Sequence, residues 1–201
     1  QVAVILVALL GVVLGSMFSS AQMDAWGWRI PFVIGCLIVP VLFVLRRSLQ
    51  ETDVFLARTH RPHTAEVFRT ILANWRIVLV GMLLVTMPTV WFQGITAYTP
   101  TFGREALKLN SLDVLTVTLC VGISNLLWIP TMGAVSDVTG RRPLMLGFAS
   151  VAAITAYPAM SWLAAEPSFA RLLMVELWLS FLYSGYNGAM IAYLTEIMPA
   201  N

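Results

Sequence analysis

Long runs with no charge, or only one charged residue, alternate with short polar segments along the chain, and this alternation predicts its architecture. A helix that rises 1.5 Å per residue needs about 20 residues to cross a bilayer. The runs approach or exceed that length, so each is predicted to form one transmembrane helix. The fold class is therefore an all-α membrane protein with six transmembrane helices, which cover residues 1–23, 30–45, 77–103, 114–136, 144–164 and 172–195.

Aromatic residues, proline and glycine refine this prediction. A short polar turn is expected at 24–29, where Trp26 and Trp28 suit a membrane interface. The run 77–103 is expected to be irregular, because proline removes a backbone N–H and glycine is conformationally permissive. The residues responsible are Pro88, Gly94 and Pro100.

The composition agrees with a membrane protein. Hydrophobic residues make up 59% of the 201 residues and charged residues only 11%, whereas a soluble domain has about 25% charged residues. Cys36 and Cys120 lie inside apolar runs, and we interpret them as small buried hydrophobic side chains. The first run starts at Gln1 with no basic segment before it, so we expect the chain to be a piece of a longer protein.

Basic residues predict the orientation in the membrane. The polar segments after the second and fourth runs carry eight Lys and Arg residues, and the other three segments carry four. Positive charge is retained on the cytoplasmic side, so the segment 46–76 and the turn near residue 140 are predicted to be cytoplasmic. Part of 46–76 is expected to form a surface helix, because apolar residues recur there at helical spacing. His60 and His63 in this segment have no third ligand nearby, and no metal site is predicted.

The turn between the fourth and fifth runs reads Gly133-Ala-Val-Ser-Asp137-Val-Thr-Gly140-Arg141-Arg142-Pro143. It resembles the signature loop of major facilitator superfamily transporters, except that Val138 stands where an arginine is usual. The resemblance implies two six-helix bundles joined by a cytoplasmic loop, and this chain is similar to the fifth to tenth helices. Residues 1–45 would then be the last two helices of the N-terminal half, 46–76 the central loop, and 77–201 the first four helices of the C-terminal half.

Two further stretches, Trp26 to Phe32 and Arg46 to Phe55, resemble the metabolite–proton symporter branch of that superfamily. The stretch from Glu176 to Pro199 is similar to the citrate and tricarballylate carriers. The resemblance implies a secondary active transporter of the cytoplasmic membrane that takes up citrate or a related tricarboxylate with protons by alternating access. It implies no cofactor, because the proton gradient is the driving force.

Three alternatives remain open at this point. The substrate could be another organic acid, or an osmolyte such as proline or betaine. The chain could also be a membrane sensor or assembly subunit of the same fold that transports nothing. An enzyme is not indicated, because no Gly-x-Ser-x-Gly, HExxH or phosphate loop is present. No basic and aromatic surface for nucleic acid is present either.

Polar residues inside the runs are the candidates for function, since polar groups in lipid are costly and usually face the bundle interior. On the last run, Glu176, Ser180, Tyr183 and Asn187 fall within roughly a 60° sector of a helix. A second stripe on the third run consists of Thr86, Thr89, Gln93 and Thr96. Hydrogen bonding between helices is the alternative to substrate contact. The predicted substrate-binding residues are Gln93, Asn125, Tyr183 and Asn187.

Charged residues give two further predictions. Asp137 beside Arg141 and Arg142 is expected to fasten the signature turn to a neighbouring helix end, so the predicted conformational gate is Gly133, Asp137, Gly140, Arg141 and Arg142. Glu176 is a candidate for proton coupling, although it lies only about one turn inside its run and could instead sit at the membrane interface. No Lys or Arg lies in the middle of a run, so the cations that bind a tricarboxylate are expected on helices outside this chain.

Overall fold

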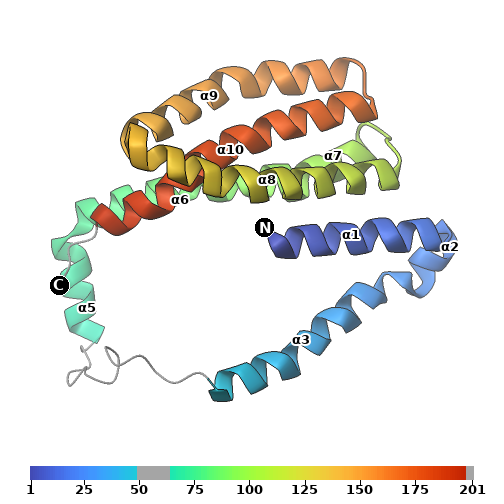
Figure 1. The fold of residues 1–201 in the computed structure, drawn as a ribbon, viewed down its shortest axis with the longest axis horizontal. Coiled ribbons are helices and arrows are strands. Elements are labelled where there is room, and N and C mark those ends of the chain that lie inside the picture. The colour runs from blue at the N-terminus through green and yellow to red at the C-terminus, as the bar shows by residue number, and fades with distance from the viewer. Residues whose placement is uncertain (49–63, 198–201) are drawn as a thin grey trace. The chain divides into compact units, whose positions relative to one another are not determined.

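The computed structural model describes residues 1–48 and 64–197, and within these ranges the chain is helical with no strand (Figure 1). The described chain divides into two compact units. One consists of Gln1–Met17 with Leu79–Asn201, and the other is Phe18–Val78. The domain boundaries predicted from the sequence stay predictions.

In the unit Phe18–Val78, the first helix break differs from the prediction. The first break comes earlier, at Phe18 and Ser19, and the chain continues through α2 (Ser20–Gln22), the π-helix η1 (Met23–Gly27) and α3 (Arg29–Ser48). A turn at Trp28, inside the predicted 24–29, separates η1 from α3. The backbone N–H of Ser19 donates to the Gln22 side chain at 3.1 Å, and the Gln22 N–H lies 3.4 Å from the Ser19 hydroxyl. This is the reciprocal pattern of a capping box, which starts a helix.

The segment 46–76 contains a helix, as predicted: α5 (Thr64–Ala73), which precedes α6 (Trp75–Gln93). Its position along the membrane surface stays a prediction. Phe68, Ile71 and Leu72 are exposed on α5. The residues 49–63, which include Arg58, His60, Arg61 and His63, lie outside the described part of the chain.

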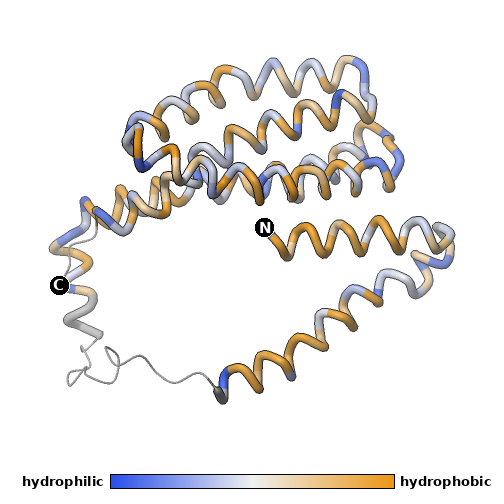
Figure 2. Tube along the Cα trace, in the orientation of Figure 1, coloured by the Kyte–Doolittle hydropathy of each residue, from blue (hydrophilic) through white to orange (hydrophobic). Residues whose placement is uncertain are grey.

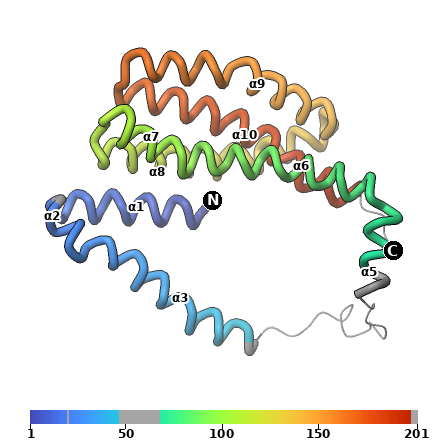
Figure 3. The backbone as a smooth tube through the Cα atoms, turned by 180° about the vertical axis from the view of Figure 1, so that it is seen from behind, coloured from blue at the N-terminus to red at the C-terminus, as the bar shows by residue number. Residues whose placement is uncertain are grey.

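The larger unit is built on three consecutive antiparallel helices, α8 (Ser111–Thr139), α9 (Arg141–Ala165) and α10 (Phe169–Ile197). In Figures 1 and 3, α10 lies between the other two and packs along both. The helix α1 (Val2–Met17) packs against α8. The π-helix η2 (Gly94–Tyr98) follows α6 and leads into α7 (Thr99–Glu105), so the predicted irregularity of this run is confirmed.

Four helical segments of the described chain are long and apolar enough to cross a membrane: Met23–Arg46, Trp75–Glu105, Ser111–Thr139 and Arg141–Ala165. Figure 2 shows their predominantly hydrophobic colouring. The apolar helix α1 has 16 residues, and α10 has 29. The polar residues on α10 lower its hydropathy, but at 1.5 Å per residue its length is ample for a bilayer. Together, these helices correspond to the six predicted runs.

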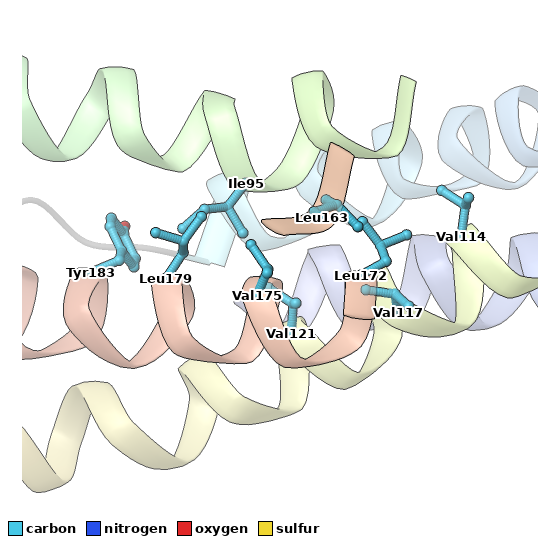
Figure 4. Packing of buried hydrophobic residues seen from close by; sticks show 9 residues of the cluster. All are labelled: Ile95, Val114, Val117, Val121, Leu163, Leu172, Val175, Leu179 and Tyr183. Atoms are coloured by element: carbon cyan, nitrogen blue, oxygen red, sulfur yellow. The ribbon is translucent and has the colours of Figure 1, made fainter. Parts of the chain in front are cut away.

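The apolar core of the larger unit lies along α10 (Figure 4). Leu172, Val175, Leu179 and Tyr183 of α10 pack against residues of η2, α8 and the end of α9. The other members of this cluster are Ile95, Val114, Val117, Val121 and Leu163. A second cluster forms further along α10 and consists of Met145, Tyr186, Ala189 and Met190.

The helices α8 and α10 cross with their backbones in contact. A Cβ atom added to Gly188 would lie 2.6 Å from the Ile129 carbonyl oxygen and 2.9 Å from the Gly133 nitrogen. Real Cβ atoms do not approach backbone atoms so closely, so glycine at 188 is what lets the helices touch. The crossing lies on the same stretch of α8 that leads into the signature turn.

Candidate functional site

The helices that flank the signature turn extend into it beyond the predicted ends at Ser136 and Leu144. Residues 133–139 continue α8, and α9 begins at Arg141, so only Gly140 separates the two helices. Gly140 has φ of 89°, a left-handed conformation that glycine adopts without strain. The predicted tight reversal at Gly140 is therefore confirmed. Asp137 consequently projects from the last turn of α8.

The two arginines of the turn reach α10 by separate contacts. Arg141 donates from one guanidinium nitrogen to the Asp137 carboxylate at 3.1 Å and from the other to the Glu196 carboxylate. Arg142 donates its Nε–H to the Tyr193 hydroxyl at 2.6 Å. Charge-assisted bonds of this kind are stronger than neutral ones. The turn is thus fastened to the last turns of α10.

A shallow polar pocket lies at this end of the unit and is lined by Asp137, Arg141, Arg142, Tyr193 and Glu196, among others. Val138, where an arginine would be expected from the family pattern, is 88% exposed and takes no part in these contacts. Sequence reasoning did not identify Tyr193 and Glu196 as partners of the turn. The sequence feature that could have indicated them is their spacing: Tyr193 and Glu196 are polar residues three positions apart at the end of the last run.

Asn125 forms the centre of a buried polar network between α8 and α10. Its side chain is 1% exposed, and its Oδ1 accepts hydrogen bonds from the hydroxyls of Ser180 and Ser184 at 2.9 Å each. The hydroxyl oxygens of Ser124 and Ser180 lie 3.1 Å apart. The Asn125 Nδ2 has no hydrogen-bond partner within the described chain. The polar stripe of α10 therefore meets α8 at Ser180, and Ser184, outside the predicted stripe, joins it.

Tyr183 and Asn187 continue the same face of α10. Tyr183 is buried in the apolar cluster, where its ring centre lies 5.9 Å from that of Phe92 on α6. Asn187, one turn further, is half-buried. Gln93, which follows Phe92, is exposed and makes no side-chain hydrogen bond to another described residue. The structure thus places Tyr183 next to α6, the helix that carries Gln93, but shows no hydrogen bond between the Tyr183 and Gln93 side chains.

The threonines of the predicted stripe on α6 and η2 bond within their own helix. Thr86 and Thr89 donate to the carbonyl oxygens of Met82 and Val85, each at 2.7 Å. Thr96 donates in the same way to Phe92 at 2.6 Å. Back-bonding of this kind satisfies a hydroxyl inside a membrane helix without an external partner.

Glu176 is buried among helices, with only 2% of the residue exposed. Neither of its carboxyl oxygens has a hydrogen-bond partner among the described residues. A carboxyl group at a membrane interface would have access to water, so the interface interpretation does not fit this burial. An unpartnered buried carboxyl in a helical bundle is rare because of its desolvation cost, and such groups commonly mark ion pathways.

A groove of about 600 Å³ lies between α6 with η2, α9 and α10. Its lining is mostly apolar and includes Trp91, Ile95, Tyr98, Met160 and Leu179. None of the predicted substrate-binding residues lines it. The lining contains no Lys or Arg, so the groove offers a carboxylate no opposite charge to pair with.

These features define a polytopic helical membrane protein whose one-residue turn is locked to a neighbouring helix end by arginines. The chain belongs to the Major Facilitator Superfamily, whose family model matches residues 2–201. No solved structure matches the chain.

Three curated relatives align with nearly the whole chain. It is 53% identical over 199 residues to the citrate-proton symporter of Salmonella typhi, covering 99% of this chain and 46% of that protein. It is 50% identical over 200 residues to the citrate-proton symporter of Klebsiella pneumoniae, covering 100% and 45% respectively. It is 30% identical over 202 residues to the alpha-ketoglutarate permease of Escherichia coli strain K12, covering 98% and 45%. The chain thus spans less than half the length of these relatives.

Proposed function

We propose that this chain forms part of a secondary active transporter that carries citrate, or a related tricarboxylate, together with protons by alternating access. The observation that carries the proposal is the identity of 53% and 50%, over essentially the whole chain, to two proteins named citrate-proton symporters. The alpha-ketoglutarate permease, named for a dicarboxylate, is much more distant at 30%. The tricarboxylate is therefore the favoured substrate class.

The setting of this transporter would be the bacterial cytoplasmic membrane, with the helices crossing it several times. Its partners would be the organic anion, protons and lipid, with the proton gradient as driving force and no cofactor. Metal ions and nucleic acid have no part in the proposal. The cations that neutralise citrate would be supplied by helices outside this chain, because no Lys or Arg lies in the middle of a predicted span.

The proposed substrate site lies on the polar face of α10. Substrate sites in this architecture lie near the bilayer midplane, between the two halves. Tyr183 is the fifteenth of the 29 residues of α10 and so occupies its midpoint. Asn187 would flank the site one turn further, with Gln93 of α6 and Asn125 of α8 as further polar contacts. The burial of Tyr183 against Phe92 supports a position facing the bundle interior.

The proposed gate is the signature turn, consisting of Gly133, Asp137, Gly140, Arg141 and Arg142. Its contacts with Tyr193 and Glu196 would stabilise one state of the carrier, because they hold the α8–α9 turn against the end of α10. Opening at this end would require breaking charge-assisted hydrogen bonds. The close crossing at Gly188 would let α8 and α10 move as one body.

The test is transport by the complete carrier in proteoliposomes. Radiolabelled citrate should accumulate against its gradient when the lumen is alkaline, and an added protonophore should abolish the accumulation. Unlabelled tricarballylate should compete, while alpha-ketoglutarate should compete less and betaine not at all. Accumulation of betaine but not citrate would overturn the substrate assignment. Citrate binding without any transport would favour the membrane-sensor alternative instead.

A further inference from the structure

The polar groups beside Glu176 are two threonine hydroxyls, each of which already donates its proton to a backbone carbonyl. A cavity of about 10 Å³ adjoins Glu176, at the lower limit of the roughly 10–15 Å³ that one water molecule requires. Thr99 of α7 and Thr118 of α8 line it, and its other lining residues are apolar. The cavity lies at the Val114, Val117 and Leu172 end of the cluster drawn in Figure 4.

Both threonines use their only hydroxyl proton on a backbone carbonyl. Thr99 donates to the Gly94 carbonyl at 2.9 Å, within the π-helical turn, and Thr118 donates to the Val114 carbonyl at 3.0 Å. A hydroxyl has one donor and two acceptor sites, so what these residues offer the cavity is acceptor lone pairs. An ionised carboxylate only accepts hydrogen bonds and finds no donor there. A protonated carboxylic acid has an O–H to donate and finds acceptors.

No other charge compensates the carboxyl group. The lining of the cavity, drawn from η2, α7, α8 and α10, contains no second titratable side chain. The charged residues elsewhere on α7, α8 and α10 near this end are Arg104, Glu105, Asp113 and Arg171. Arg171 is paired with Glu166 and donates to the Trp162 carbonyl. Burying an unpaired ionised carboxylate is far more costly than burying the neutral acid.

From this geometry we propose that Glu176 is the group in this chain that binds and releases the coupled proton, an inference that rests on the proposed proton symport. In the arrangement described here, the carboxyl group is protonated and sealed between α7, α8 and α10. A proton from water on the outer side bonds to one carboxylate oxygen, and the same proton later leaves to water on the cytoplasmic side. Each cycle therefore moves one proton inward and returns Glu176 to its starting state.

The position of Glu176 suits this role. It lies near the start of α10, at the same end of the unit as the 106–110 and 166–168 connections. The distribution of basic residues predicts that this end faces outward, where protons enter under the gradient. The signature turn lies at the opposite end of α8 and α10, so protonation and the gate would act on the same two helices from opposite ends.

The experiment compares proton movement with citrate movement in the complete carrier. Reconstituted wild-type protein is given citrate in liposomes that contain a pH-sensitive dye, and citrate-dependent acidification and citrate accumulation are measured together. Glu176→Gln keeps the shape and the neutral charge of the protonated acid. It should lose pH-driven accumulation and citrate-dependent acidification, while citrate–citrate exchange at equal pH continues. The matched control is Glu105→Gln, which changes an exposed carboxylate on α7 and should behave as wild type.

Two further variants keep the carboxyl and test its surroundings even if Glu176→Gln does not fold. Thr99→Val and Thr118→Val each remove an acceptor for the protonated acid. The pH midpoint of citrate uptake should therefore shift toward acid. A shift toward alkaline pH would mean that the threonines donate to the carboxylate, and it would overturn the proposal. Full proton coupling in Glu176→Gln would also overturn it, whereas wild-type citrate transport without proton movement would instead overturn the proposed symport itself.

Discussion

Arg142 and Tyr193 are joined by a 2.6 Å hydrogen bond from the arginine Nε–H to the tyrosine hydroxyl, although 51 residues separate them. The guanidinium carbon also lies 5.7 Å from the centre of the Tyr193 ring, within reach of a cation–π interaction. Arg141, the preceding residue, bonds Glu196 one turn later on α10. The two arginines therefore fasten the α8–α9 turn to α10 with two different partners.

The first prediction concerns this fastening. Asp137→Asn replaces an acceptor carboxylate by a neutral amide and weakens its bond with Arg141, so transport by the complete carrier should slow. Citrate affinity should stay within a few-fold, because the turn does not contact the proposed substrate face. Rates and affinities are measured in proteoliposomes, with the exposed Val138→Ala as control. A normal rate in Asp137→Asn would make the turn a marker of topology only.

The second prediction concerns the helix crossing. Gly188→Ala places a methyl group 2.6 Å from the Ile129 carbonyl oxygen, so α8 and α10 must separate. Overpacking of this kind costs about 1–3 kcal/mol, and the thermal unfolding temperature of the purified carrier should fall. The matched control is Gly147→Ala on α9, where an added Cβ meets no described atom within 4 Å. Equal melting temperatures for the two variants would contradict the close crossing.

The third prediction concerns the proposed substrate face. Tyr183→Phe removes one hydroxyl and keeps the ring that packs near Phe92, so the fold should be retained. A hydrogen bond to a charged ligand is worth about 1.5–3 kcal/mol, or roughly ten- to a hundred-fold in affinity. Citrate binding should weaken by that factor in Tyr183→Phe, and also weaken in Asn187→Ala and Gln93→Ala. Unchanged binding in all three, at normal expression, would leave this face as an interhelical contact.

The fourth prediction separates two roles for Asn125. Its Oδ1 accepts hydrogen bonds from Ser180 and Ser184, so Asn125→Ala should destabilise the carrier by about 1–3 kcal/mol through loss of a buried acceptor. If Asn125 also contacts substrate, citrate affinity should fall beyond the change seen in Ser180→Ala/Ser184→Ala, which removes the same network from the other side. Equal citrate affinity in the two variants would limit Asn125 to a structural role.

The fifth prediction concerns orientation. After Cys36 and Cys120 are replaced by alanine, a single cysteine at Lys108 should react with a membrane-impermeant thiol reagent added to intact cells. A cysteine at Thr139 should react only when the cytoplasmic face is opened. Both positions are exposed in the structure, so access to reagent depends on the side of the membrane. A cysteine at Arg58, outside the described residues, should label like Thr139, and the reverse pattern would overturn the orientation.

The helical membrane class follows from the amino-acid sequence alone, because the hydropathy of about 20 consecutive residues is a local quantity that can be compared directly with the thickness of a bilayer. The same holds for the reversal at Gly140 and the helix Thr64–Ala73, where a glycine and a helical spacing of apolar residues were sufficient. The sequence predicted that the first helix continues to residue 23, because the run 1–23 is uncharged. The structure ends α1 at Met17, and the reciprocal contacts between Ser19 and Gln22 start a new helix within that run.

The face by which each helix meets its neighbours is visible only once the helices are packed together. Lipid tails are as apolar as leucine, so hydropathy does not distinguish the lipid-facing side of a membrane helix from the packed side. The bonds of Asn125 with Ser180 and Ser184, and those of Arg141 and Arg142 with α10, join residues more than 50 positions apart. The burial of Glu176 likewise depends on how α7, α8 and α10 rotate about their own axes, which packing sets and the order of residues along one helix does not.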